Sequence, residues 1–254
     1  AKLEKDTRSV FVRIGNIKGF VFCQVRYVGQ PVALVVAESL DLCRDALELI
    51  EVDYNSLPAV THQSEAIKDG APQIWDDIPN NICLDFELGD EDAQKKAFED
   101  ADHVITLELV NNRVTAAPIE PRGALADYDA ETGKFTLWNA SQNIHANRDT
   151  IADTVLKIGK ENLHHIAPDV GGGFGGKNGV YQEPILILHA ARELKRPVKW
   201  VNDRSESFLS DTHGRDQVST VQLALDNDGT FRGLRTETVG NLGAFCGTVG
   251  PFTP

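Results

Sequence analysis

The stretch Pro168-Asp-Val-Gly-Gly-Gly-Phe-Gly-Gly-Lys177 says more about the fold than any other part of the chain. It lies between residues 163–167, which are typical of a short strand, and residues 181–194, whose apolar spacing predicts a helix. Half of its residues are glycine, which forfeits side-chain packing and raises the entropy of the unfolded chain. Such a composition is favoured where something must approach the backbone closely, so we expect a ligand to touch this main chain.

Two nucleotide-binding patterns fit this loop incompletely. Gly171, Gly173 and Gly176 satisfy G-x-G-x-x-G after a strand, but the acidic residue expected about 20 positions later is replaced by the pair Arg196-Pro197. The pattern G-x-x-x-x-G-K also matches, yet Asn178 stands where a Ser or Thr would bind magnesium. The first pattern leaves a nicotinamide-dinucleotide-binding dehydrogenase as an alternative, and the second disfavours a nucleoside triphosphatase.

The N-terminal part of the chain reads as a small strand-helix-strand unit. Residues 30–37 form an apolar, valine-rich run that predicts a strand buried on both faces. Ser39 then offers a helix N-cap, the apolar spacing over residues 40–50 predicts a helix, and residues 51–54 predict a second strand. Residues 69–89 are rich in Pro, Asn, Asp and Gly, which is the composition of a linker. We therefore expect one domain over residues 1–75 and another over residues 90–254.

The second part of the chain mixes helices with antiparallel hairpins. Glycine near the end of a short polar turn predicts two hairpins, around Asp129–Gly133 and around Asp226–Gly229. His164 and His165 should face opposite sides of their strand, so they cannot share one metal ion. The other expected elements are helices over residues 90–100 and 147–158, a half-buried strand over residues 103–110, and a strand over residues 198–201.

Composition excludes several classes of protein. The formal net charge is -13 with no basic stripe, which excludes the counterion release on which nucleic-acid binding depends. The longest apolar run, residues 31–37, falls far short of the roughly 18 residues that a membrane span needs. No charged-then-apolar signal segment opens the chain, so a cytoplasmic location is expected.

Cysteine usage argues against a disulfide framework, a zinc site or an iron-sulfur cluster in this chain. Cys23, Cys43, Cys83 and Cys246 lie far apart in the sequence, and no C-x-x-C pair occurs. Cys246 is expected to be a small buried residue. Any electron carrier of this kind must therefore come from another chain.

The glycine-rich loop resembles the cofactor loop of the xanthine dehydrogenase, aldehyde oxidase and carbon monoxide dehydrogenase family, whose large subunit binds molybdopterin. The resemblance implies an α+β protein: an α/β hammerhead domain over residues 1–75, then the first part of the molybdopterin-binding domain over residues 90–254. The chain ends at Pro254 without a closing element, so we expect more of this domain to follow. Further segments agree in the family's order: Val28–Glu38, Ile119–Gly123, Ser141–Asn143, Arg196–Trp200 and Asp203–Glu206.

The resemblance also implies the site. Gln142 matches a glutamine that hydrogen-bonds an oxygen ligand of molybdenum, and Gly173, Phe174 and Gly175 match the backbone that lies against the cofactor. No residue of this chain is expected to bind the metal directly. The general base is expected in a later part of the complete subunit, and neither Glu120 nor Glu183 is assigned to that role, so no catalytic residue is expected here.

The activity implied is that of a molybdenum hydroxylase, which hydroxylates an aldehyde, an N-heterocycle or a similar carbon centre with water-derived oxygen. The cofactor would be molybdenum-molybdopterin, as such or as its cytosine dinucleotide, and electrons would pass to iron-sulfur and FAD centres on partner subunits. Asn178 replaces the glutamate that helps xanthine-oxidising members bind purines, so a purine substrate is not expected. This chain alone should be inactive. The alternative of another class is a non-catalytic scaffold or binding fragment with the same fold.

Overall fold

The computed structural model describes Ser9–Phe11 and residues 24–246, and these divide into two compact units. The first unit combines the described residues up to Ser56 with Thr115–Thr212. The second combines Leu57–Val114 with the described residues from His213 onward. Each unit is therefore built from two separate stretches of chain, and the first division falls before the expected linker at residues 69–89.

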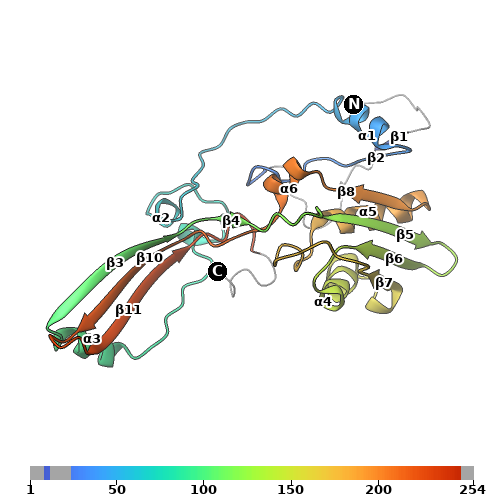
Figure 1. The fold of residues 1–254 in the computed structure, drawn as a ribbon. Helices are drawn as coiled ribbons and strands as arrows, with labels where there is room; N and C mark the ends of the chain where they lie inside the picture. Colours follow the sequence, from blue (N-terminus) through green and yellow to red (C-terminus); the bar gives the residue numbers. More distant parts are fainter. Residues whose placement is uncertain (1–8, 12–23, 247–254) are drawn as a thin grey trace. The chain divides into compact units, whose positions relative to one another are not determined.

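The first unit is centred on a four-stranded sheet with strand order β7-β6-β5-β8 (Figure 1). Strands β5 (Gly123–Asp129) and β6 (Lys134–Asn139) form the first expected hairpin, and Gly133 takes the positive φ of 72° that its turn requires. Strand β7 (Leu163–Ile166) runs parallel to β6, whereas β8 (Val198–Val201) pairs antiparallel with β5. The sheet is thus mixed, and the glycine-rich loop leaves it after β7.

Helix α5 (Gln182–Leu194) covers the middle of this sheet and supplies much of the core. It packs against β5, β6 and β8, and most of its residues are buried, including the apolar run Pro184–Leu188. Helix α4 (Ile144–Asp149) continues into a π-helical stretch, Thr150–Leu156, and contacts β7. A short 3-10 turn, Lys160–Asn162, precedes β7. The most deeply buried core side chains are Ala126, Leu137, Ala152, Ile187, Leu188, Ala190 and Ala191.

The N-terminal part of the first unit contains a two-stranded sheet of β1 (Ser9–Phe11) and β2 (Val35–Ala37), followed by α1 (Leu40–Leu47). The expected cap is present, since the Ser39 side chain accepts a hydrogen bond from the Leu42 amide at 3.3 Å. The expected strand over residues 30–37 is wrong in length and burial, because only its last three residues pair and these are half-buried. The expected strand over residues 51–54 is absent, because this exposed stretch has no partner strand among the described residues.

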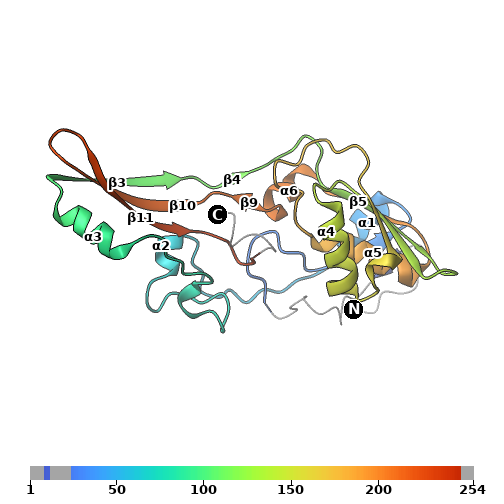
Figure 2. The same ribbon diagram turned by 90° about the horizontal axis from the view of Figure 1, so that it is seen from below.

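The second unit is a three-stranded antiparallel sheet with strand order β11-β10-β3, seen in Figure 2 as a long ribbon beside α3. Strands β10 (Gln217–Leu225) and β11 (Phe231–Gly240) form the second expected hairpin, in which Gly229 has a φ of 86°. Helix α3 (Glu91–Glu99) is capped by Asp90, whose side chain accepts from the Ala93 amide at 2.9 Å. Strand β3 (His103–Asn111) was expected to be half-buried, but every one of its residues is exposed. Alternation predicts a strand without specifying what covers it.

The remaining elements are short. Helix α2 (Gln63–Ala66) and the 3-10 turn Pro79–Asn81 lie in the region expected to be a linker or close to it. Strands β4 (Val114–Thr115) and β9 (His213–Gly214) pair with each other, and α6 (Arg204–Ser210) follows β8. No helix within the described ranges is both long enough and apolar enough to span a membrane.

The cysteines depart from expectation at two positions. Cys246 is exposed, so its expected role as a small buried residue is wrong. Its thiol lies 3.6 Å from the Cys83 sulfur in the second unit, a contact between residues far apart in the sequence that spacing could not show. Both thiols are free, as is Cys43, whereas Cys23 lies outside the described residues.

Candidate functional site

The glycine-rich loop, Gly171–Lys177, has a backbone that most residues could not adopt. Gly172 and Gly175 have φ angles of 94° and 89°, and even Phe174 has a positive φ of 49°. Helix α5 begins only at Gln182, so the loop does not open a helix as a dinucleotide-binding or P-loop would. This geometry removes the structural context that both nucleotide-binding patterns require.

Gln142 follows β6 closely and its side chain reaches into the loop. Its Oε1 accepts hydrogen bonds from the amides of Gly175 at 3.0 Å and Lys177 at 3.1 Å. Its own backbone N–H donates to the Lys177 carbonyl at 3.0 Å. The structure therefore brings together the glutamine and the loop, which are far apart in the sequence.

These bonds orient the Gln142 amide. Two N–H donors occupy Oε1, so the oxygen end of the amide faces the loop and the NH₂ end is left to donate elsewhere. Nε2 makes no hydrogen bond to any residue in the described part of the chain. A neutral donor of this kind can bind a metal-bound oxygen without adding charge.

Gly173 lies close to the Gln142 side chain. A Cβ at this position would lie only 2.4 Å from Cδ of Gln142. Glycine is thus required here to admit the glutamine. Around Gly175, by contrast, a Cβ would meet nothing within 4 Å, so this part of the loop borders open space.

Three successive loop amides remain available to a ligand. The N–H groups of Gly172, Gly173 and Phe174 have no acceptor among the residues that the structure describes. Gly173 is buried, and buried amides without a partner are rare in folded proteins. Consecutive amides in loops with positive φ form concave sites for anions and other oxygen-rich groups. The Phe174 ring beside them is 77% exposed.

Glu120 and Lys177 hold the two ends of the loop together. Oε2 of Glu120 accepts from the Gly171 amide at 2.7 Å and from Nζ of Lys177 at 2.7 Å. Lys177 is only 2% exposed, and Glu120 is its ion-pair partner. Burial raises the pKa of Glu120, but the bonds from Lys177 and Gly171 outweigh it and leave this pKa below its usual range. Glu120 is therefore a structural carboxylate at neutral pH.

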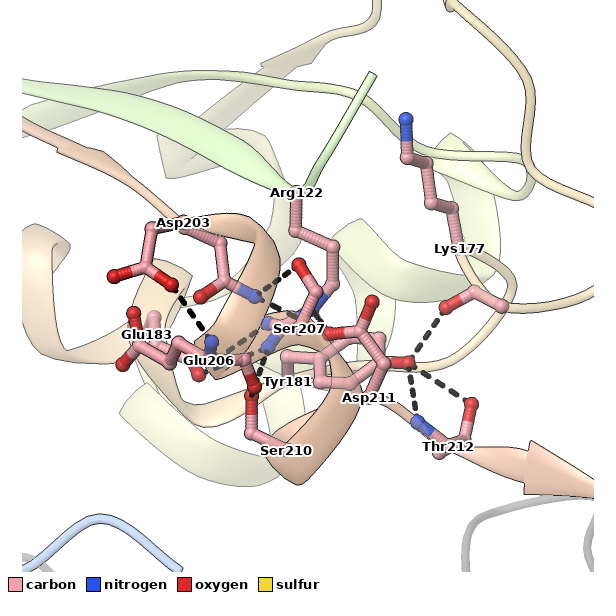
Figure 3. A network of polar contacts seen from close by, with 12 residues as sticks. Arg122, Lys177, Tyr181, Glu183, Asp203, Glu206, Ser207, Ser210, Asp211 and Thr212 are labelled. Atoms are coloured by element: carbon pink, nitrogen blue, oxygen red, sulfur yellow. Dashed lines mark hydrogen bonds and ion pairs between the residues drawn. The ribbon is translucent and has the colours of Figure 1, made fainter. Parts of the chain in front are cut away.

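A second polar network surrounds Arg122 (Figure 3). Its guanidinium donates to both carboxylate oxygens of Glu183, at 2.8 and 3.1 Å, and to Asp211 at 2.6 Å. It also donates to the Ser210 hydroxyl at 3.1 Å. Burial lowers the pKa of Arg122, but the two carboxylates raise it by more, so the guanidinium stays charged. Glu183 is thus committed to an ion pair.

Tyr181 connects this network to the loop. Its hydroxyl bonds the Gly176 carbonyl at 2.6 Å, and it accepts from the Thr212 amide at 3.1 Å. The Arg122 guanidinium lies 3.7 Å from the centre of the Tyr181 ring, within the range of a cation–π contact. The glycine-rich loop is therefore held by Tyr181 as well as by Gln142 and Glu120.

Sequence reasoning missed this support. Arg122 lies in a segment that was matched only by resemblance to the family. Its position in the sequence does not show that it forms ion pairs with Glu183 and Asp211. Tyr181 was read only as the start of a helix. No group of three or more His, Cys, Asp or Glu side chains within the described residues is placed to hold a metal ion.

Comparison with known proteins identifies this loop and its surroundings. Residues 74–254 match the family model of the molybdopterin cofactor-binding domain. The chain belongs to this family. The match covers the glycine-rich loop, Gln142 and both polar networks, but not the residues before Ile74.

The similar proteins are large subunits of molybdenum enzymes. The chain is 37% identical over 223 residues to the nicotine 6-hydroxylase large subunit of Paenarthrobacter nicotinovorans, covering 87% of this chain and 27% of that protein. It is 33% identical to the carbon monoxide dehydrogenase large chain of Afipia carboxidovorans, covering 87% of this chain and 29% of that protein.

Solved structures agree with these matches. Cu,Mo-CO dehydrogenase in its carbon monoxide reduced state has a TM-score of 0.77 at 32% identity, over 82% of this chain and 28% of that one. Quinoline 2-oxidoreductase from Pseudomonas putida 86 has a TM-score of 0.74 at 35% identity, over 84% of this chain and 27% of that one. The chain thus spans less than a third of the length of each of these four proteins.

Proposed function

We propose that this chain forms the cofactor-binding front part of the large subunit of a molybdenum hydroxylase. The observation that carries the proposal is the orientation of Gln142, whose Oε1 is held by two loop amides while its Nε2 remains free to donate. Gly173 shapes the loop around that side chain, and Phe174 and Gly175 border the open space next to it. Gln142, Gly173, Phe174 and Gly175 are the residues that we assign to cofactor binding.

The described residues fit a bulky, oxygen-rich cofactor. The unpartnered amides of Gly172, Gly173 and Phe174 can donate to its oxygens, and the absence of a side chain at Gly175 lets it lie against the main chain. When bound, molybdenum-molybdopterin supplies the two-electron redox centre at which water-derived oxygen is transferred to carbon. The residues of this chain would hold and orient the cofactor: Gln142 donates one neutral hydrogen bond, and the ion pair of buried Lys177 with Glu120 keeps the loop closed.

The wider assembly follows from the same assignment. Iron-sulfur and FAD centres on partner subunits would carry the electrons away, and the remaining part of the large subunit would supply the general base. The cofactor would be the pterin or its cytosine dinucleotide, and the location cytoplasmic. Residues 1–75 would form the α/β hammerhead domain, and residues 90–254 the first part of the molybdopterin-binding domain.

The substrate is an aldehyde, an N-heterocycle or a similar carbon centre. Asn178 presents a neutral amide where a purine-binding glutamate stands in xanthine-oxidising members, so it offers no carboxylate to a purine. The exposed Phe174 ring favours a flat, apolar substrate over a charged one. Quinoline, which appears in the name of one relative, is a flat heterocycle of that kind, and nicotine, in the name of another, contains a flat pyridine ring.

The proposal is tested with Gly175→Val and a matched control, Gly229→Val, in the protein as the cell makes it. Both glycines have nearly the same φ, 89° and 86°, and neither position has an atom within 4 Å of an added Cβ. The backbone strain should therefore be alike, about 1–2 kcal/mol, but only the loop variant places a branched side chain against the cofactor. We expect molybdenum and pterin content to fall at least about tenfold in Gly175→Val and to stay unchanged in the control.

Unchanged molybdenum content in a folded Gly175→Val protein would contradict the proposal. The scaffold alternative makes the opposite prediction for the wild type, namely a folded and assembled protein with molybdenum far below one atom per subunit. Metal analysis of the wild-type complex by mass spectrometry therefore separates the two functions before any variant is made.

A further inference from the structure

We propose that Tyr181 is a positioning residue that sets the orientation of Gln142 through the Gly176–Lys177 peptide. This inference rests on the proposed function, because it assigns the residue that aims the glutamine at the cofactor. Tyr181 has no cofactor contact of its own in this scheme. Its effect passes through one peptide group.

The first step is the geometry of that peptide. The carbonyl of Gly176 and the N–H of Lys177 belong to one planar trans unit and point in opposite directions. The Tyr181 hydroxyl bonds the carbonyl oxygen at 2.6 Å, and the N–H donates to Oε1 of Gln142 at 3.1 Å. Rotating the peptide plane would break both bonds together. A bond that fixes the carbonyl therefore also fixes the donor that holds the glutamine.

The second step is the direction of the tyrosine hydroxyl. A phenol has one hydrogen to donate and can accept from others. The Thr212 amide donates to the oxygen at 3.1 Å, and the Thr212 hydroxyl lies 2.9 Å away. The Gly176 carbonyl can only accept, so the phenol hydrogen must point to it and the Thr212 hydroxyl must donate to the phenol. Burial raises the pKa of Tyr181, so this hydrogen is present at neutral pH.

The third step is what holds the ring. Arg122 lies over its face at 3.7 Å from the centre, and that guanidinium is itself fixed by Glu183 and Asp211. Asp211 is followed directly by Thr212, so one short segment fixes both the guanidinium and the phenol. Figure 3 shows these side chains converging around Tyr181. The buried ion pairs therefore act on Gln142 through a ring that cannot tilt freely.

The test is Tyr181→Phe, which removes the hydroxyl and keeps the ring under Arg122. The matched control is Tyr128→Phe in the hairpin strand β5, whose ring packs on Phe135 and whose hydroxyl bonds no residue of the described chain. The first measurement is hydrogen exchange of the peptide that contains the Gly175 and Lys177 amides, in the protein as the cell makes it. We expect exchange about fivefold faster in Tyr181→Phe, as the loss of one hydrogen bond implies, and no change in the control.

The second measurement is steady-state kinetics with molybdenum content determined on the same samples. Because Gln142 should act on the reacting centre and not on substrate binding, we expect kcat to fall about fivefold with KM nearly unchanged. The Mo(V) electron paramagnetic resonance signal should shift, since its g values respond to hydrogen bonds at the metal ligands. Thr212→Val removes only one partner of the phenol, so it should produce a smaller change in the same direction and provides a second, milder variant.

The outcomes separate the two ideas. Wild-type exchange rates at Gly175 and Lys177 in a folded Tyr181→Phe protein would overturn the positioning role, and so would faster exchange with an unchanged kcat. Molybdenum far below one atom per subunit in the folded wild-type complex would overturn the proposed function instead, whatever the exchange rates of these amides. A fall in kcat together with an altered resonance signal and faster exchange would support both.

Discussion

The two sheets of this protein carry similar sequence signals but differ in how they are covered. In the β7-β6-β5-β8 sheet, Leu137 is fully buried, and Leu188 of the helix that covers it is also fully buried. In the β11-β10-β3 sheet, Leu107 is 56% exposed and Leu234 is 63% exposed. Both sheets contain a hairpin closed by a glycine turn, so the difference comes from the covering layer and not from the strands.

The uncovered sheet has two unlike faces. The register places Gly233 opposite Ala224 and Val104, and an added Cβ at Gly233 would lie 3.1 Å from Ala97 of α3. This face is therefore covered by α3 at one end. The opposite face is more apolar, and within the described residues nothing packs on it as α5 packs on the other sheet. Its members are Ile105, Leu107, Leu109, Val221, Leu223, Leu225 and Leu234. The comparison shows that alternating apolar and polar residues identify strands but do not show which elements cover the sheet that they form.

The largest expected difference between the two units concerns ion pairs. Arg122→Met in the first unit would leave Glu183 and Asp211 without an ion-pair partner, and their side chains are only 11% and 9% exposed. We expect a loss of about 3–5 kcal/mol in the free energy of unfolding. Arg113→Met in the second unit removes the pair with Asp216, in which the arginine side chain is 42% exposed, and should cost under about 1 kcal/mol.

Urea unfolding followed by circular dichroism measures both losses on this chain. Equal losses for the two arginine variants would break the comparison, because they would mean that burial does not govern these pairs. Adding Glu183→Gln to Arg122→Met should recover part of the stability, since one of the two unpaired charges is then removed.

Core packing should show the next largest difference. Leu188→Ala in α5 removes a fully buried side chain, and we expect a loss of about 2–5 kcal/mol in the free energy of unfolding. Leu107→Ala in β3 removes a side chain that is already 56% exposed, so the loss should stay under about 1 kcal/mol. The same urea titrations apply. A loss for Leu107→Ala as large as that for Leu188→Ala would show that its sheet face is covered, for example by a second copy of the chain.

The sequence predicted local structure well where local chemistry determines it. The cap at Ser39 and the turns at Gly133 and Gly229 depend on a few neighbouring residues, and each is found as expected. The predicted strand over residues 51–54 is absent, and the one over residues 30–37 is present only in part. Strand pairing depends on a distant partner that the pattern of apolar residues does not reveal. The exposure of β3 was missed for the same reason.

The site was predictable in part. Glycine content pointed to close approach at the loop, and resemblance paired it with Gln142, which the structure places in hydrogen-bond contact with Gly175 and Lys177. The close approach of Gln142 to Gly173 could not be predicted, because it joins two segments that are far apart in the sequence. The roles of Arg122 and Tyr181 could not be predicted, since their partners are brought in from other segments by the fold.

The smallest expected effect is on the pH dependence of the free energy of unfolding. It concerns two adjacent residues of β7, one buried and one exposed. His165 faces the interior, where its ring nitrogens lie 3.1 Å from the Ile144 carbonyl and 2.7 Å from the Asn139 side chain, whereas His164 is exposed. Burial lowers the pKa of His165 below its ordinary value of 6.5, and burial likewise lowers the pKa of His189.

Because the unfolded chain then binds a proton that folded His165 does not, stability should fall as the pH drops below about 6.5, by up to about 1.4 kcal/mol per pH unit. His165→Gln should reduce this slope without removing it, since His189 still contributes. Urea unfolding between about pH 7.5 and 5.5 measures the slope. An identical slope in His165→Gln and wild type would contradict this prediction, because it would mean that folded and unfolded His165 bind protons equally over this pH range.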